Sequence, residues 1–117
     1  MRARRQFFMD CHLAGRKYHD ADLVWNELKV GTELQLEHEP DNHYDPNAVA
    51  VLYTRQGEEE PYLLGYIPRS ENTPLAHLLE AGWGSLFTCR ISQLVPDAHP
   101  ENQVNLTITL KRNPEAE

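Results

Sequence analysis

Six strand-like runs joined by short connections limit the folds open to this chain. They lie at residues 7–18, 32–39, 48–53, 62–67, 85–95 and 103–111, and most of them alternate apolar with polar side chains between turn-forming residues. The connections lack the spacing of repeated βαβ units, which argues against a parallel sheet. We therefore expect a small, mostly antiparallel barrel or a strongly bent sheet.

Two helical patterns interrupt these strands and are expected to plug the ends of the barrel. The first opens at Asp20, a good N-cap residue, and ends at Gly31. Its apolar face repeats at helical spacing through Ala21, Val24, Trp25 and Leu28. The second is announced by the block ENTP at residues 71–74, a capping residue followed by proline at the first helical position, and ends at Gly82. The predicted order is β-α-β-β-β-α-β-β, a mainly β fold with two helices.

Three of the predicted strands carry features that bear on their place in the sheet. The first alternates through Phe7, Met9, Cys11 and Leu13, and Gly15 bends or ends it. The run at 48–53 is continuously apolar, which is typical of a central strand covered on both faces. Gly65 lies inside the 62–67 strand and predicts a bulge, or a place where another backbone or a ligand comes close.

Length and charge define the organisation of the chain. At 117 residues, with 40% hydrophobic and 25% charged residues, it is expected to form one domain with a single modest core. We place this domain at residues 7–112, between a basic N-terminal extension at 1–6 and a C-terminal tail at 113–117. A net charge of −7 argues against broad adhesion to nucleic acid, so any binding to phosphates would be local.

The chain shows no signal for a membrane or for export. No run approaches the roughly 18 apolar residues that a membrane span requires. The apolar run at residues 7–9 is too short for the core of a signal peptide. Cys11 and Cys89 lie far apart and outside any CxxC pair, which predicts two small buried residues in a reduced compartment, with a disulfide possible but not indicated. We expect a cytoplasmic protein.

The segment from Glu39 to Val51 holds more polar chemistry than a turn requires. Pro40 and Pro46 fix φ and withhold two backbone donors, so the loop between them cannot join a regular ladder. The short polar side chains of this loop can bond their own backbone and make it rigid; they are Asp41, Asn42, Asp45 and Asn47. On the residues alone, a well-made polar turn and a binding loop both remain open.

Catalysis finds little support in the sequence. It contains no glycine-rich phosphate loop, no GxSxG and no HExxH. An acid/base pair of Asp41 and Asp45 would lack a nucleophile and an oxyanion site nearby. A metal site could be drawn from His38, Asp41, His43 and Asp45, but their spacing matches no recognised ligand set. We expect a protein that is not an enzyme and has no cofactor, no catalytic residue and no metal ligand.

Recognition of a single strand of nucleic acid fits the residues better. Tyr18, Tyr44 and Tyr66 each lie next to a strand end or a predicted bulge, where side chains leave the core. Basic residues accompany two of them, at Arg16, Lys17 and Arg69. Aromatic faces that stack on bases, interleaved with cations that meet phosphates, are typical of single-strand grooves on small barrels. Each tyrosine taken singly is more often a half-buried packing residue, so the prediction rests on the combination.

Three blocks of the sequence closely resemble the HIRAN domain family. They are EPDNHYDPNAVAV at residues 39–51, LGYIPR at 64–69 and LAGRKY at 13–18. The resemblance extends over roughly residues 7–110, and outside the blocks it consists mainly of the strand pattern. It implies an OB-like fold, here a six-stranded OB-like barrel. It also implies capture of the 3′ end of single-stranded DNA, as in fork-remodelling ATPases that carry such a domain.

The resemblance assigns roles to positions of this chain. Tyr44 would stack on the terminal base, and Tyr18 would supply a second stacking face. Asp45 would accept a hydrogen bond from the free 3′ hydroxyl, while a terminal phosphate would be repelled. Asn42 and Asn47 would shape the pocket.

Five further residues are expected to bind DNA: three cations, one tyrosine and one histidine. Arg16, Lys17 and Arg69 would meet the backbone phosphates. Tyr66 belongs to the matching LGYIPR block, and His43 stands where many members have proline and adds a titratable group to the loop. Because no ATPase motor is recognisable, the resemblance implies a binding module that acts in repair, replication or defence with a partner ATPase or nuclease.

Two alternatives of other classes remain at this point. The chain could be a protein-interaction adaptor that docks a partner through its acidic surface, which would bind without regard to DNA. A metal-dependent hydrolase centred on His43 is the third.

Overall fold

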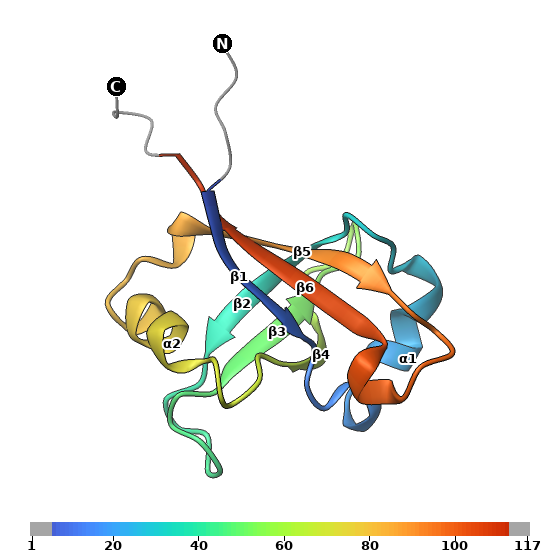
Figure 1. The fold of residues 1–117 in the computed structure, drawn as a ribbon, viewed down its shortest axis with the longest axis horizontal. Coiled ribbons are helices and arrows are strands. Elements are labelled where there is room, and N and C mark those ends of the chain that lie inside the picture. Colours follow the sequence, from blue (N-terminus) through green and yellow to red (C-terminus); the bar gives the residue numbers. More distant parts are fainter. Residues whose placement is uncertain (1–5, 113–117) are drawn as a thin grey trace.

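The fold follows the predicted order of strands and helices (Figure 1). The structure, a computed structural model, describes residues 6–112. Within this range the chain forms the strands β1 (Gln6–His12), β2 (Glu33–His38), β3 (Val49–Tyr53), β4 (Tyr62–Tyr66), β5 (Phe87–Leu94) and β6 (Val104–Leu110), and the helices α1 (Ala21–Val24) and α2 (Thr73–Glu80). The predicted C-terminal tail and all of the predicted basic extension except Gln6 lie outside the described residues.

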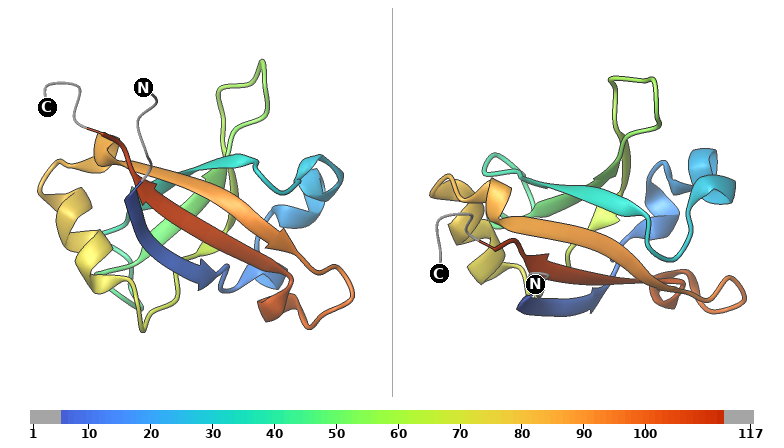
Figure 2. Two further views of the ribbon diagram at one scale, coloured as in Figure 1. Left: turned by 45° about the horizontal axis from the view of Figure 1, so that its top comes forward. Right: turned by 90° about the horizontal axis from the view of Figure 1, so that it is seen from above.

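All six strands of the described range belong to one antiparallel sheet with the order β1-β6-β5-β2-β3-β4. The sheet curls strongly, so that β1 and β6 lie on one side of the core and β2 and β3 on the other (Figure 2). The helices α1 and α2 lie at opposite ends of the curled sheet (Figure 1). The prediction of a mainly antiparallel, OB-like β fold with two helices is confirmed.

The curled sheet is not a closed barrel, which corrects the expected closure. The first and last strands of the order, β1 and β4, do not form a ladder with each other within residues 6–112. A single bridge joins the two edges just beyond β1, where Ala14 N donates to Tyr66 O at 2.8 Å and Tyr66 N donates to Ala14 O at 2.9 Å. The bridge draws the segment after β1 against the end of β4.

Gly65 makes this close approach of the two edges feasible. A Cβ atom at Gly65 would lie 2.5 Å from the carbonyl oxygen of Ala14, which no side chain can accept. The ladder between β3 and β4 also shifts register next to Gly65, between Val51 and Leu52. The sequence predicted a bulge or a close backbone contact at this glycine, and the structure has both.

The first predicted strand is wrong in its second half. β1 ends at His12, and Arg16–Tyr18 form a 3₁₀ turn after Gly15, whose φ of 71° needs a residue without a side chain. The register of β1 against β6 also shifts between Phe7 and Met9. Phe8 therefore turns inward against Phe87, with ring centroids 5.1 Å apart, and Phe7 is exposed.

The helices are shorter than their patterns suggested. α1 has only four residues before a 3₁₀ turn at Trp25–Glu27, and the side chain of Asp20 makes no capping bond. Asp20 instead donates its backbone N–H to Leu63 O at 2.8 Å, so the helix start is held by β4. In α2, Asn72 precedes the helix as predicted, and Leu75 is buried.

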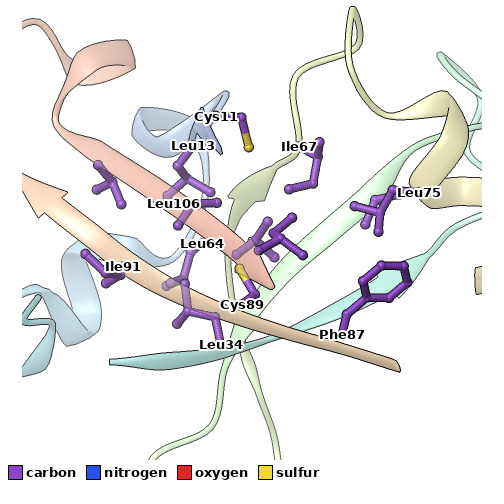
Figure 3. Close-up of a cluster of buried hydrophobic side chains, with 14 of the residues drawn as sticks. Cys11, Leu13, Leu34, Leu64, Ile67, Leu75, Phe87, Cys89, Ile91 and Leu106 are labelled. Carbon is purple, nitrogen blue, oxygen red and sulfur yellow. The ribbon is translucent and has the colours of Figure 1, made fainter. Parts of the chain in front are cut away.

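The core fills the space inside the curled sheet and under both helices (Figure 3). Its buried members come from every strand and from both helices, and Leu13, Leu64, Leu75, Ile91 and Leu106 are among those that are fully buried. Each large apolar side chain buried in this way contributes roughly 1.5–3 kcal/mol to folding. No helix in residues 6–112 has the length and apolar character needed to cross a membrane.

Candidate nucleic-acid interface

A groove of about 490 Å³ opens where the segment after β1, the β2–β3 loop, the end of β4 and the start of α2 meet. Its lining combines aromatic, charged and amide side chains with a small apolar floor: Ala14, His19, Asn42, Tyr44, Asp45, Ala48, Tyr66, Ile67, Arg69 and Asn72. The bridge between Ala14 and Tyr66 and the loop between the two prolines thus bring the matching blocks of the sequence to one site.

The loop between β2 and β3 is held by bonds to its own backbone, as predicted for Asn42 and Asp45. The Asn42 side-chain oxygen accepts hydrogen bonds from the backbone N–H groups of Tyr44 at 2.9 Å and Asp45 at 3.1 Å. Asp45 Oδ1 in turn accepts from the backbone N–H of Asn47 at 2.9 Å. These Asx-type bonds fix the backbone on which Tyr44 and Asp45 stand.

Asp45 receives donors from outside the loop as well. Its Oδ2 accepts a hydrogen bond from Asn72 Nδ2 at 2.8 Å and lies 3.7 Å from Arg69 Nε. The bonds from Asn72 and from the Asn47 backbone, together with the Arg69 charge, lower the pKa of the Asp45 carboxyl. The side chain is therefore ionised at neutral pH and presents a fixed negative charge to the groove.

Tyr44 and Arg69 form the exposed rim next to this carboxylate. The Tyr44 side chain is 85% exposed, which is unusual for an aromatic residue in a folded domain. The Arg69 guanidinium donates to the Tyr44 carbonyl oxygen, yet its side chain remains 74% exposed. An exposed ring beside an exposed cation offers a stacking face and a phosphate contact within one rim.

Tyr66 forms the inner wall of the groove and is anchored rather than free. Its hydroxyl donates to Glu39 Oε1 at 2.9 Å, and the same oxygen accepts from Asn42 Nδ2 at 3.0 Å. Burial and the bond to Glu39 raise the pKa of Tyr66 to about 12. The His19 ring meets the Tyr66 ring edge to face, with centroids 5.4 Å apart.

Arg16 does not take part in this groove. Its side chain is buried, with the guanidinium 4.1 Å above the centre of the Trp25 ring and Nη1 2.8 Å from Asp22 Oδ1. A cation packed in this way supports the fold and is not available to a phosphate. The burial of Arg16 therefore argues against the predicted contact between this residue and DNA. Trp25 packs against the core, as its place on the apolar stripe predicted.

The other expected binding residues do not line the groove. Lys17 and Tyr18 are exposed on the 3₁₀ turn next to His19, and His43 is exposed beside Tyr44. Asn47 donates its side-chain amide to Thr73 Oγ1 at 3.3 Å and so ties the loop to α2. Of the ten expected residues, the groove brings together Asn42, Tyr44, Asp45, Tyr66 and Arg69.

Two polar residues of the groove, His19 and Asn72, were not among the predicted site residues. Asn72 was interpreted only as a helix cap, and His19 only as the residue before a helix. Neither has a local pattern that indicates a site, because both reach the groove through tertiary contacts. The only available signal was the closeness of His19 to the LAGRKY block and of Asn72 to the LGYIPR block.

The four residues from which a metal site could be drawn, at positions 38, 41, 43 and 45, do not form such a site in the structure. Across residues 6–112, no group of three or more His, Cys, Asp and Glu side chains is arranged to hold a metal ion. His38 instead lies with Nε2 2.9 Å from the Pro46 carbonyl oxygen and Nδ1 3.1 Å from Glu80 Oε1. It thereby links the loop to the end of α2.

Comparison with known proteins identifies solved structures with a similar fold. A solved protein from Lactobacillus plantarum shares 27% identity and a TM-score of 0.72, over 93% of this chain and 98% of its own. The HIRAN domain of human HLTF has the same fold, with a TM-score of 0.59 at 17% identity, over 87% of this chain and 73% of its own.

One curated relative is the Fanconi-associated nuclease 1 homolog of Oryza sativa subsp. japonica. It is 38% identical over 72 residues, which is 62% of this chain but only 7% of the relative. The model of the HIRAN domain family matches residues 6–112, nearly the whole chain. The chain belongs to the HIRAN domain family.

Proposed function

We propose that this chain is a non-enzymatic module that binds single-stranded DNA ending in a free 3′ hydroxyl. Membership of the HIRAN family supports binding to DNA. The choice of the 3′ end follows from the resemblance of the sequence blocks to the family. The preference for a hydroxyl over a phosphate rests on the ionised Asp45 carboxylate beside the exposed Tyr44 ring. The module would act in DNA repair, replication or defence.

The Asp45 carboxylate supports discrimination between two kinds of DNA end. A carboxylate oxygen has two acceptor positions, so each Asp45 oxygen can accept one bond beyond those from Asn47 and Asn72. A 3′ hydroxyl donates a hydrogen bond to such an oxygen, and a charge-assisted bond of this kind is worth about 1.5–3 kcal/mol. A 3′ phosphate offers only negative oxygens, which a carboxylate repels.

The rest of the strand would meet the rim of the groove. The Tyr44 ring is placed to stack on the terminal base, and base–aromatic stacking is worth about 1–3 kcal/mol per base. The exposed Arg69 lines the groove, and the exposed Lys17 lies two residues before His19 in the chain; both would meet the adjoining phosphates. With so few cations and a net charge of −7, binding should depend only weakly on salt.

The relatives suggest the setting in which the module acts. The rice relative is named a nuclease, and this chain matches a small segment of it. A binding module of this type would deliver a DNA end to a catalytic partner. We therefore propose a nuclease or an ATPase as the partner protein.

Titration with labelled oligonucleotides that differ only in a 3′ hydroxyl or 3′ phosphate tests the proposal. We expect the hydroxyl strand to bind at least ten-fold more tightly. Tyr44→Ala should weaken binding of both strands by one to two orders of magnitude, because stacking on the terminal base is lost. Asp45→Asn should abolish the preference for the hydroxyl, because the repelling charge is gone.

Two matched variants control for charge and for exposed aromatic surface. Asp41→Asn removes the same charge from an exposed position of the same loop, and Trp83→Ala removes an exposed ring that lies outside the groove. Both should bind like the unmodified protein. Equal affinity for the two strand ends would overturn end recognition. Binding of a partner protein that survives Tyr44→Ala and ignores DNA would favour the adaptor alternative.

A further inference from the structure

Asn72 is a buried amide at the junction of α2 and the groove. Its side chain is only 2% exposed, although asparagine is mostly found on protein surfaces. It occupies the N-cap position of α2, yet its side chain makes no capping bond to the helix backbone. The side-chain amide is directed away from its own helix, and Nδ2 donates to Asp45 Oδ2 at 2.8 Å.

The two oxygens of Asp45 are held from two different elements. Oδ1 is bonded by the Asn47 backbone inside the loop, and Oδ2 is bonded by Asn72 from α2. The terminal torsion of an aspartate is broad, so one bond alone leaves the carboxylate free to rotate. The second donor, itself immobilised by burial, sets the plane of the carboxylate.

The junction around Asn72 is braced by neighbouring contacts. Asn47 bonds to Thr73 at 3.3 Å, one residue beyond Asn72. The turn before α2 is closed by the bond from Glu71 N to Pro68 O at 2.9 Å, and Asn72 O accepts from Ala76 N at 2.8 Å. The backbone of Asn72 is thus held by both the turn and the helix, so its amide has little freedom to leave Asp45.

We propose that Asn72 is a positioning residue that orients the Asp45 carboxylate toward the terminal 3′ hydroxyl and so sets the preference for hydroxyl over phosphate ends. The inference rests on the proposed function and extends it to a residue on α2. Asn72 acts through Asp45. It should therefore affect the selectivity between DNA ends far more than the affinity contributed by stacking on Tyr44.

The test measures affinity for 3′-hydroxyl and 3′-phosphate oligonucleotides with Asn72→Ala and Asn72→Ser. Serine keeps a polar residue that is favourable before a helix but is too short to reach Asp45. We expect both variants to lower the ratio of the two affinities about ten-fold and to leave binding of the phosphate strand almost unchanged. Glu71→Gln, at the exposed neighbouring position, should keep the ratio of the unmodified protein.

A double-mutant cycle separates positioning from general loss of structure. In an Asp45→Asn background, Asn72→Ser should cause no further change in the ratio, because the group that it orients has been removed. In the protein without DNA, the carboxyl carbon resonance of Asp45 should titrate at a higher pH in Asn72→Ser than in the unmodified protein. If Asn72 only supported the helix, Asn72→Ser would change the binding ratio by the same factor with and without Asp45→Asn, and the titration of Asp45 would stay as in the unmodified protein.

The outcomes distinguish failure of the inference from failure of the proposed function. If the unmodified protein prefers hydroxyl ends and Asn72→Ser keeps the full preference, the positioning role is wrong and end recognition stands. If the unmodified protein shows no preference, end recognition fails, and the role of Asn72 in it fails as well.

Discussion

The acidity of the Asp45 side chain is set by its neighbours in the fold. Its carboxylate is bonded by Asn72 and by the Asn47 backbone and lies near the exposed Arg69. These contacts favour the charged form and lower its pKa. The neighbouring Tyr44 has the opposite character, because its ring is almost fully exposed and is held only through its backbone.

The lowered pKa of Asp45 predicts how stability should depend on pH. A carboxylate with a depressed folded-state pKa contributes stability that is present above its unfolded pKa, about 4, and is lost as pH falls through the folded value. Asp45→Asn should therefore lower the free energy of unfolding by a constant amount between pH 7 and pH 5. The difference should shrink only below about pH 4.

Chemical denaturation of both proteins at several pH values measures this difference. Asp41→Asn, which removes the same charge from an exposed position of the same loop, is the control. A gap that closes between pH 7 and pH 5 would show that Asp45 is not the group responsible.

At the scale of elements, the groove depends on the contact between the segment after β1 and the end of β4. The two-bond bridge between Ala14 and Tyr66 joins segments that belong to opposite edges of the sheet. It also places His19 and Tyr66 in ring contact. The bridge exists only because Gly65 leaves room for the Ala14 carbonyl.

Gly65→Ala should break this contact. The added Cβ would lie 2.5 Å from backbone, which cannot move aside as a flexible side chain could. We expect a loss of about 2–3 kcal/mol in the free energy of unfolding, the upper part of the range for overpacking. Thermal and denaturant unfolding would measure it.

Gly84→Ala is the matched control, because its Cβ would meet the nearest atom at an ordinary 3.6 Å. It should change stability by less than about 1 kcal/mol, since glycine is seldom the preferred residue at an ordinary backbone conformation. Similar losses in both variants would contradict the special role of Gly65.

At the scale of the whole molecule, one core lies inside the curled sheet and contains both cysteines. Cys11 and Cys89 are free and buried, on β1 and β5 (Figure 3). Burial raises the pKa of each thiol to about 12, with smaller contributions from nearby acidic groups and, for Cys89, from Cys11. At neutral pH the reactive thiolate form is therefore very rare.

Both cysteines should react with a thiol reagent only when the protein unfolds. We expect labelling at pH 7.5 to be slow in the native state and to accelerate with denaturant in parallel with the unfolding transition seen by circular dichroism. Mass spectrometry would count the labelled sites. Rapid labelling of Cys11 without denaturant would show that β1 opens independently of the core.

Much of the fold was predictable because it depends on local patterns. Alternation and turn residues identified the six strands, and Gly65 indicated a close approach. The extent of the helices was less predictable. The Asp20 pattern looked like one helix, but β4 holds its start and the chain tightens into a 3₁₀ turn after Val24. Tertiary contacts override helix propensity in so short a segment.

The sequence by itself determined the strand order along the chain and the internal bonding of the loop around Tyr44 and Asp45. These depend on residues a few positions apart, whose interactions do not require the rest of the fold. Only the tertiary structure decided that Arg16 is buried on Trp25, that Asn72 reaches Asp45 across 27 residues, and that the sheet curls without closing. The reason is physical: curling of the sheet brings distant segments together, and side-chain burial and pairing depend on which segments meet.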